Sequence, residues 1–215
     1  MMADPVPLTL TTDVVPFAIR TERLEVLLVE RSVDWRLPGG PIEPGEDLDV
    51  AARRHLAEQT GLCQVYLEQL YTFGQPGRAA GQRAVTVAYY ALVPAGSLSG
   101  EPVPLADRTG WAMVDALPTL ILDHAGIVAL ARRRLASKLA YSTIALQLMP
   151  ERFTLSELQT VHETILGEPL DKRNFRKRIL ALDCIEATGE MARRGGRRPA
   201  RLFRAKHPGQ VDFVK

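Results

Sequence analysis

The first half of the chain alternates short runs of branched aliphatic residues with polar, glycine-containing segments. Residues 12–19 and 24–29 are two such runs, separated by a polar Arg-Thr-Glu turn, and they predict the strands of a hairpin. Residues 65–73 and 84–92 predict two further strands, and the glycine-rich residues 75–83 predict the loop between them. The hydrophobic pattern therefore begins as a β-sheet.

Helical segments interrupt and follow these strands. Leu37-Pro-Gly-Gly predicts a turn that leads into a helix over roughly residues 47–59. Residues 124–149 have the pattern of a long helical stretch with a break near residues 138–141. Strands that alternate with one strong helix favour a mixed α/β sandwich, so we expect a first domain over residues 1–138.

The remaining residues, 139–215, predict a second domain built on two short helices. Residues 154–166 begin with a Thr-x-x-Glu capping box, and a glycine ends the segment. Asp171 is the expected N-cap of a second, strongly basic helix, so the pair predicts a helix-turn-helix. Residues 183–188 and 200–205 predict two strands around an arginine-rich tip, which is the wing of a winged helix.

The second of these helices has one apolar face and one basic face. At about 100° per residue, Phe175, Ile179 and Leu182 fall together and are expected in the core. Arg173, Asn174 and Lys177 lie opposite and are expected to reach base edges, because arginine reads guanine and asparagine reads adenine. The other candidates for contacts with double-stranded DNA are Thr154, Lys172, Arg176 and Arg178 on the helices, and Arg193, Arg194, Arg197 and Arg198 in the wing.

The distribution of charge supports a polyanionic partner for the second domain. The 215 residues carry a formal net charge of only +2, but residues 170–206 hold 12 Lys or Arg against 4 Asp or Glu. The hydrophobic fraction of 46% is typical of an ordinary globular chain, and no apolar run is long enough to span a bilayer. We therefore expect a cytoplasmic protein without a membrane segment.

Residues 40–62, GPIEPGEDLDVAARRHLAEQTGL, resemble the Nudix box G-x5-E-x7-R-E-U-x-E-E-x-G-U, in which U is aliphatic. His55 and Gln59 stand where this motif has glutamates. The positions that match are Gly40, Glu46, Arg54, Leu56, Glu58, Gly61 and Leu62. The resemblance implies a Nudix α/β/α sandwich for the first domain.

The two departures weaken the site that the motif builds for divalent ions. In the family, three glutamates share one face of the helix and suit Mg²⁺ or Mn²⁺ bound to a diphosphate. Here that face presents His55, Glu58 and Gln59, and neutral imidazole is a poor Mg²⁺ ligand. We expect no catalytic residues and no resident metal, although Glu46 and Glu58 leave the option of a weakly held Mg²⁺.

Binding a nucleotide makes different demands from hydrolysing it. A pocket for a nucleoside diphosphate needs arginines for the phosphates and an aromatic wall for the base. Such groups lie in or beside the box and on the glycine-rich loop. The candidate ligand-binding residues are Trp35, Arg36, Glu46, Arg54, Glu58, Arg78 and Arg83.

A degenerate Nudix box followed by a winged helix resembles the NrtR family, Nudix-related transcriptional regulators of NAD metabolism. The segments that carry the resemblance are LPGGPIEPGE, YTFGQPGR, VTVAYYALV, FTLSELQTVHETILGEPLDKRNFRKRIL and GRRPARLFR. The resemblance implies a homodimeric repressor that releases its operator when ADP-ribose or a related nucleotide binds the Nudix domain. The loop at residues 75–83 lacks the acidic residue common in the family, which leaves the effector's identity open.

Three alternatives remain open at the level of the sequence. An ADP-ribose pyrophosphatase with an accessory nucleic-acid domain would use Glu46 and Glu58 to retain one metal. A constitutive DNA-binding protein would use its Nudix half only to dimerise. Some relatives regulate sugar utilisation, so the genes under control could also belong to that class.

Overall fold

The computed structural model describes residues 7–31, 34–79, 83–95, 97, 108–192 and 199–213. They form two compact units. Unit 1 takes its described residues from Met1–Phe17, Glu25–Ala91 and Glu101–Ala131, and unit 2 from Ala18–Leu24, Leu92–Gly100 and Arg132–Lys215. Helix α2, His124–Lys138, contributes to both units, and the expected domain boundary at residue 138 stays a prediction.

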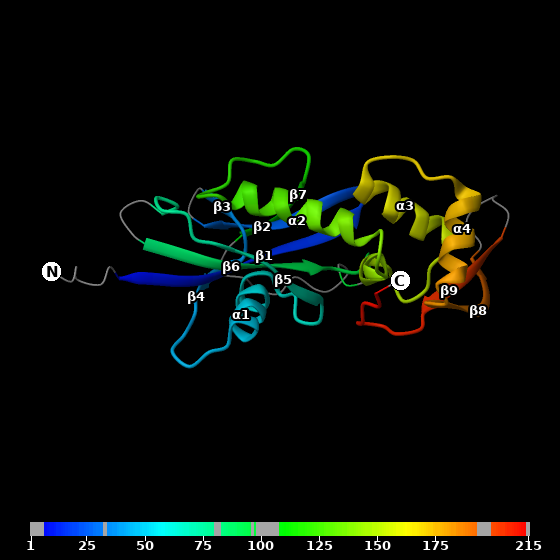
Figure 1. Ribbon diagram of the computed structural model, residues 1–215, viewed down its shortest axis with the longest axis horizontal. Helices are drawn as coiled ribbons and strands as arrows, with labels where there is room; N and C mark the ends of the chain where they lie inside the picture. The colour runs from blue at the N-terminus through cyan, green and yellow to red at the C-terminus, as the bar shows by residue number, and fades with distance from the viewer. Residues whose placement is uncertain are drawn as a thin grey trace. The chain divides into compact units, whose positions relative to one another are not determined.

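The strands of the first half assemble into one sheet with the order β3-β2-β1-β6-β5, to which β4 adds beside β1 and β7 beside β2 (Figure 1). The strands are β1 Leu8–Arg20, β2 Arg23–Arg31, β3 Asp34–Arg36, β4 Gly39–Pro41, β5 Tyr66–Phe73, β6 Arg83–Leu92 and β7 Arg108–Met113. The four predicted strands are all present, and each is close to its expected range. Val14 and Val15 of β1 and the leucines and valines of β2 are buried, as their pattern predicts, whereas Leu8 and Leu10 at the start of β1 are exposed.

A two-residue turn joins β1 and β2. Thr21 and Glu22 both have positive φ angles, 46° and 59°. Tight hairpin turns need this left-handed conformation because it matches the twist of the two strands. The predicted Arg-Thr-Glu turn is therefore confirmed, although neither left-handed position carries glycine.

Helix α1, Leu48–Thr60, packs on one face of the sheet, and Figure 1 shows the first half of α2 on the other. Asp47 caps the start of α1, and Gly61 ends it in the left-handed conformation with φ 75°. Buried residues of α1, β1 and β6 form the core beneath the helix: Val14, Ala52, Leu56, Val87, Tyr89 and Ala91. This core fixes the face of α1 that carries the box.

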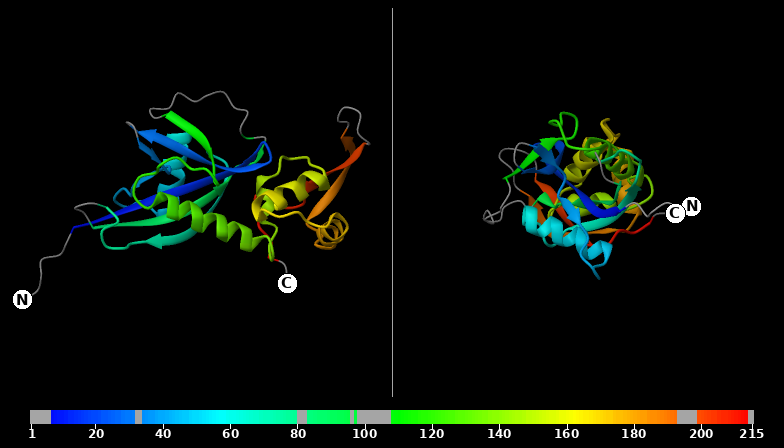
Figure 2. Two further views of the ribbon diagram at one scale, coloured as in Figure 1. Left: turned by 90° about the horizontal axis from the view of Figure 1, so that it is seen from above. Right: turned by 90° about the vertical axis from the view of Figure 1, so that its left-hand side faces the viewer.

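Unit 2 contains the end of α2, the 3-10 helix η2 (Ile144–Leu148), and the helices α3 (Leu155–Leu166) and α4 (Lys172–Ala181). Strands β8, Ile185–Ala192, and β9, Ala200–Ala205, form an antiparallel hairpin (Figure 2). Phe153 exchanges two backbone hydrogen bonds with Phe203, so an isolated β-bridge joins the segment before α3 to β9. The winged-helix prediction is confirmed.

Two local predictions need correction. Gly39 and Gly40 were expected in a turn, but they lie in β4 and pair with Asp13 and Thr12 of β1. Leu182 was expected in the core with Phe175 and Ile179, but it is only half-buried, because it follows the last residue of α4 and serves as its C-cap.

Candidate functional site

The two glycines of β4 let helix α1 and strand β1 approach this strand closely. A Cβ atom at Gly40 would lie 2.7 Å from His55 Cε1, and a Cβ at Gly39 would collide with the backbone oxygen of Thr12. Only glycine fits at such contacts. The close approach explains these glycines better than the turn that the sequence predicts.

His55 and Gln59 join α1 to the backbone of β4. His55 is buried, and its Nε2 lies 2.9 Å from the carbonyl oxygen of Pro41. The Gln59 side chain accepts a hydrogen bond from Gly39 N at 3.1 Å and donates one to Gly39 O at 3.0 Å. Gln59 Nε2 also lies 3.3 Å from His55 Nδ1, so a neutral imidazole that donates from Nε2 satisfies every contact. A glutamate could not donate at either position.

Glu46, Arg54 and Glu58 lie together beside this junction. Arg54 Nε and Nη2 donate to the two carboxylate oxygens of Glu46 at 2.7 Å each, and Glu58 lies 3.5 Å from Arg54 Nη1. The hydrogen bonds from Arg54 hold the pKa of Glu46 at about 2. Glu46 is therefore an ionised partner of Arg54 at neutral pH, while the Glu58 side chain is 60% exposed.

These residues do not fit the cluster of divalent ions that the Nudix family implies. The polar atoms of His55 and Gln59 are engaged by the β4 backbone, and both oxygens of Glu46 accept from Arg54. Within the described ranges, no group of three or more His, Cys, Asp or Glu residues is arranged to hold a metal ion. Of the three positions where the motif has helix glutamates, only that of Glu58 keeps a carboxylate, the kind of hard oxygen ligand that Mg²⁺ prefers.

Trp35 and Arg36 lie on β3 at the edge of the sheet. The Trp35 ring packs over Gly110 of β7, where a Cβ would lie 2.9 Å from the ring, and the Arg108 guanidinium carbon lies 5.7 Å from the ring centroid. Arg36 Nε is buried, and no acceptor among the described residues is within hydrogen-bonding reach. A buried donor without a partner is costly, so this nitrogen is suited to donate a hydrogen bond to a ligand oxygen. Arg108 and Gly110 were missed because their contacts are distant in sequence.

Arg78 and Arg83 take positions that the sequence does not reveal. The Arg78 side chain is only 3% exposed, and its guanidinium contacts Asp123 at 2.8 Å and Asp13 at 3.5 Å. Arg83 donates to the carbonyl oxygen of Gly74 at 2.6 Å. Arg78 therefore ties its loop to the protein core, and its predicted contact with ligand would require these ion pairs to rearrange.

A buried histidine completes the cluster around Arg78. His124 Nδ1 accepts a hydrogen bond from Leu37 N at 3.0 Å, and its Nε2 lies 3.7 Å from Asp13. Burial lowers the pKa of His124 below its ordinary value, so the ring is neutral at pH 7. The cluster links β1, the glycine-rich loop and the start of α2.

In unit 2, local sequence signals position the basic helix. Thr154 and Glu157 form the predicted capping box at the start of α3, and the Asp171 side chain accepts from Asn174 N at 2.8 Å at the start of α4. Gly167 ends α3 in the left-handed conformation with φ 77°. Phe175 is buried against the ring of His162 at a centroid distance of 5.0 Å. These contacts fix which face of α4 points outward.

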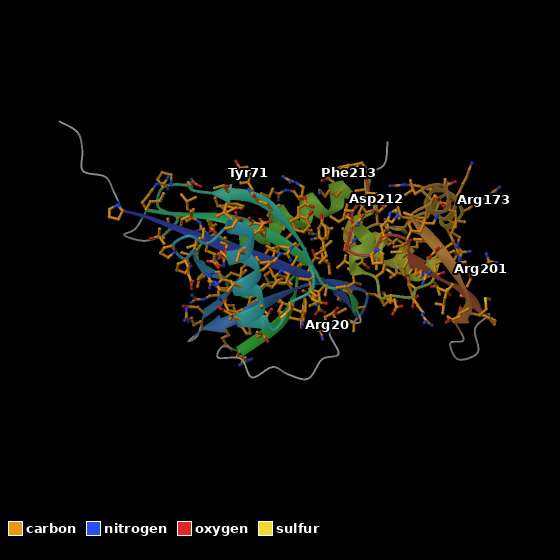
Figure 3. All side chains as sticks on the ribbon, turned by 90° about the horizontal axis from the view of Figure 1, so that it is seen from below. Arg20, Tyr71, Arg173, Arg201, Asp212 and Phe213 are labelled. Atoms are coloured by element: carbon orange, nitrogen blue, oxygen red, sulfur yellow. The ribbon has the colours of Figure 1, made fainter. Side chains whose placement is uncertain are left out.

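The outward face of α4 is cationic. Lys172, Arg173, Asn174 and Lys177 are exposed, as the helical pattern predicts (Figure 3). Arg176 is half-buried and donates to Ser156 Oγ at 3.3 Å. Their predicted contacts with DNA remain predictions.

Two of the other residues predicted to contact DNA have partners within the protein. Thr154 is buried, and its hydroxyl accepts from Glu157 N at 3.2 Å. Arg178 donates to two backbone carbonyl oxygens at the end of α2. The wing arginines Arg193, Arg194, Arg197 and Arg198 fall outside the described residues.

A cationic cleft of about 640 Å³ lies between the start of α3, helix α4 and strand β9. Lys172, Arg176 and Arg201 line it together with the Ser156 hydroxyl. Arg201, which Figure 3 labels, is an exposed residue of β9 and was not among the sequence candidates. Three cations and a hydroxyl around an open cleft suit an anionic oxygen such as a phosphate.

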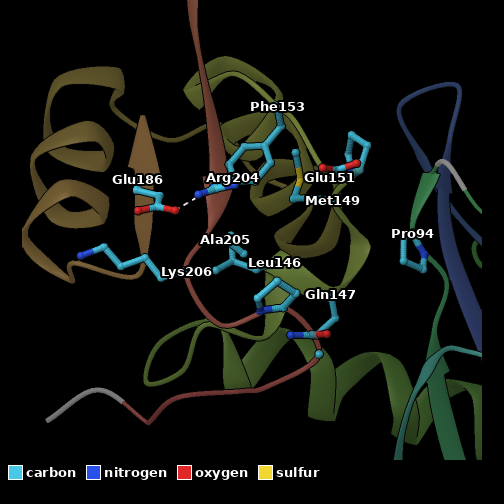
Figure 4. A pocket seen from close by; sticks show the side chains of 13 residues that line it. Pro94, Leu146, Gln147, Met149, Glu151, Phe153, Glu186, Arg204, Ala205 and Lys206 are labelled. Atoms are coloured by element: carbon cyan, nitrogen blue, oxygen red, sulfur yellow. Dashed lines mark hydrogen bonds and ion pairs between the residues drawn. The ribbon is translucent and has the colours of Figure 1, made fainter. Parts of the chain in front are cut away.

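A second hollow of about 460 Å³ borders the opposite end of the same hairpin (Figure 4). Its floor includes Met149, Phe153 and Ala205, and the Glu186–Arg204 ion pair, 2.7 Å long, crosses its rim. Its lining includes Glu151 and Glu186 beside Arg204 and Lys206, and this mixture of charges distinguishes the hollow from the cationic cleft. No helix in the described part of the chain is both long and apolar enough for a membrane span.

The chain matches two domain families. Residues 9–131 match the NUDIX domain, and residues 145–205 match the family described as the NrtR DNA-binding winged helix domain. The chain is 34% identical over 209 residues to the ADPR responsive transcriptional repressor NtrR of Acinetobacter baylyi, a match that covers 93% of this chain and 82% of the relative.

Two solved structures extend the similarity. The crystal structure of Shewanella oneidensis NrtR complexed with a 27mer DNA is 36% identical, with a TM-score of 0.81 and coverage of 92% of this chain and 93% of that one. The NUDIX domain of the Shewanella oneidensis protein complexed with ADP ribose is 33% identical, with a TM-score of 0.52 and coverage of 60% of this chain and 89% of that one. Both the two-domain order and each domain separately therefore have counterparts.

Proposed function

Because this chain belongs to the NrtR family of Nudix-related transcriptional regulators, we propose that it is a DNA-binding repressor that ADP-ribose releases from its operator. The relatives described above are a repressor that responds to ADPR, a complex with DNA and a complex with ADP ribose. The observation that carries the proposal is the basic α4 and its cationic cleft in a chain whose Nudix helix lacks a metal-binding carboxylate cluster. We propose genes of NAD metabolism as its targets, with genes of sugar utilisation as the alternative.

The exposed face of α4 provides the contacts with bases. Arg173, Asn174 and Lys177 have the donors and acceptors that read the major groove, and all three are exposed. Lys172, Arg176 and Arg201 surround the cationic cleft and would hold the phosphate backbone. Two such helices in a homodimer would bind two half-sites of one operator.

The Nudix unit provides the effector site. Trp35 offers an aromatic surface for the base of ADP-ribose, and the buried Arg36 Nε lacks an acceptor among the described residues. We propose that ADP-ribose binds here without being hydrolysed, because His55 and Gln59 bond to the β4 backbone and leave no carboxylate cluster for a metal. Binding without turnover is what a sensor requires.

A gel-shift titration tests the repressor. The protein is bound to the DNA upstream of its own gene, and ADP-ribose, NAD and ADP are added in turn. We expect ADP-ribose to lower the affinity for DNA and the other two to act weakly. If no concentration of any of them changes the affinity, the sensing half of the proposal fails while DNA binding stands.

A residual hydrolase is the second candidate, and the exposed carboxylate of Glu58 is the observation that favours it. Incubation of the protein with ADP-ribose and millimolar Mg²⁺ or Mn²⁺, followed by chromatography of the products, separates the two functions. We expect no turnover. Turnover that Glu58→Gln abolishes would replace the sensor by an enzyme.

A further inference from the structure

The end of helix α2 is closed by an arginine from the basic helix. Arg178 of α4 donates from Nη2 to the carbonyl oxygens of Leu139, at 2.6 Å, and Ala140, at 3.1 Å. Both carbonyls lie in the turn that follows α2, one and two residues past its last residue, Lys138. The guanidinium bonds to both groups, so Arg178 joins α4 to the turn after α2.

The other cations of α4 do not share this role. Lys172, Arg173 and Lys177 are exposed, and Arg176 donates to Ser156 at the start of α3. Among the described cations of α4, Arg178 is the one that bonds to the turn after α2. Its guanidinium is engaged by backbone oxygens of the protein itself.

The start of α2 is tied by a second arginine, in unit 1. Asp123 immediately precedes the helix, and its carboxylate accepts from Arg78 Nε at 3.0 Å and contacts Arg78 Nη2 at 2.8 Å. His124, the first residue of α2, accepts from Leu37 N, two residues before β4. The start of α2 is thus bonded to the glycine-rich loop and to the segment that leads into the box.

We propose that α2 carries the effector signal to the basic helix and that Arg178 is the positioning residue that receives it. This inference rests on the proposed function and adds the path by which effector binding would reach the DNA-binding helix. A ligand that rearranges the box or the loop of Arg78 changes the bonds at the start of α2. The bond between Arg178 and the carbonyls of the turn after α2 then has two states, made and broken, and DNA favours one while ADP-ribose favours the other.

Arg178→Gln tests this role, with Lys172→Gln on the same helix as the matched control. Fluorescence anisotropy measures the affinity for operator DNA over a range of salt concentrations, with and without saturating ADP-ribose, and calorimetry measures the affinity for ADP-ribose. An effector commonly changes affinity by about 5- to 150-fold. We expect Arg178→Gln to reduce that change to less than about twofold, with ADP-ribose binding to the free protein retained and the salt dependence unaltered.

Lys172→Gln should show the reverse. Its effector response stays as in the wild type, and the slope of log affinity against log salt falls in size by about 0.9, the value for one lost phosphate contact. If Arg178→Gln behaves like this control, Arg178 is a phosphate contact and the inference is overturned. If the wild type itself ignores ADP-ribose, the proposed function fails before the variant is considered.

Hydrogen exchange on the wild-type protein decides the case in which Arg178→Gln does not fold. With operator DNA bound, addition of ADP-ribose should speed exchange together in peptides that cover residues 136–142 and 175–182. Unchanged exchange in both peptides, while DNA is released, would mean that the signal bypasses this bond and would overturn the inference.

Discussion

At the scale of single residues, the structure of the box depends on which side chains can donate a hydrogen bond. A carboxylate only accepts hydrogen bonds, whereas Gln59 donates to Gly39 O and accepts from Gly39 N. His55 Nε2 likewise lies within hydrogen-bonding distance of the Pro41 carbonyl oxygen. The residues that remove metal ligands therefore also attach α1 to β4, so the two departures from the motif have a structural purpose that their identities alone do not reveal.

Replacing both residues with the glutamates of the motif should destabilise the fold. We expect His55→Glu with Gln59→Glu to lower the free energy of unfolding by about 1–3 kcal/mol, because carboxylates cannot donate to Gly39 O or Pro41 O. Urea denaturation at neutral pH measures the change. Glu58→Gln, on the same helix but exposed, is the control and should stay within about 0.5 kcal/mol of the wild type. Equal stability of the double variant would contradict this account of the site.

At the scale of elements, the helix-turn-helix is the part of the fold that the sequence predicts most directly. Helix caps depend on residues that are close in sequence. Thr154 and Glu157 therefore indicate the start of α3, and Asp171 indicates the start of α4. Its core face follows from helical periodicity. The roles of the basic residues of α4 could not be predicted in this way, because Arg176 and Arg178 make contacts with other elements that periodicity cannot indicate.

Two substitutions separate reading of bases from contact with the backbone. Arg173→Ala should reduce discrimination between operator and unrelated DNA by about 1–3 kcal/mol, because it removes one of the base contacts that we propose for the exposed face of α4. Arg201→Ala should weaken binding to all sequences and reduce the salt slope by about 0.9, because this residue lines the cationic cleft. Competition binding at several salt concentrations measures both. Loss of discrimination in Arg201→Ala would show that our division of roles is wrong.

Acidification should weaken the packing between α3 and α4. Burial lowers the pKa of His162, whose Nδ1 lies 2.9 Å from Leu158 O and whose ring packs on Phe175. The unfolded chain, with an ordinary histidine pKa of about 6.5, takes up a proton that the folded chain refuses, so stability falls as pH drops below that value. Denaturation at pH values from about 7.5 to about 5 measures the decline. His162→Gln should decline less steeply, whereas an identical decline would assign the effect to other groups such as His124.

At the scale of the whole molecule, the order of the domains and their fold classes could be predicted from the sequence, whereas the long-range polar contacts could not. Arg78 meets Asp13 and Asp123, which are 65 and 45 positions away, and Arg178 meets a carbonyl 39 positions away. The local sequence pattern identifies each arginine as a candidate for binding an anion. It cannot show that the guanidinium already bonds to a carboxylate or a carbonyl of the same chain. The glycines of β4 were misread for the same reason, since the atoms that crowd them come from β1 and α1.

Effector binding should stabilise the molecule in proportion to ligand concentration. At about 100 times the dissociation constant, ADP-ribose should add about 2.7 kcal/mol to the unfolding free energy of the unit that binds it. Thermal unfolding followed with increasing ADP-ribose, without added metal, measures this shift. Trp35→Ala should lose the shift, and Lys177→Ala, on the face proposed for DNA, should keep it. A shift retained in Trp35→Ala would place the nucleotide elsewhere.

The junction between α1 and β4 also restricts how this protein can change over generations. Gln59 Nε2 contacts both Gly39 O and His55 Nδ1, so replacing Gln59 leaves the Nδ1 of buried His55 without this donor. A change of Gln59 alone to glutamate should therefore cost stability before a set of three carboxylates is complete. The fold itself is thus expected to oppose a return to the metal-binding motif.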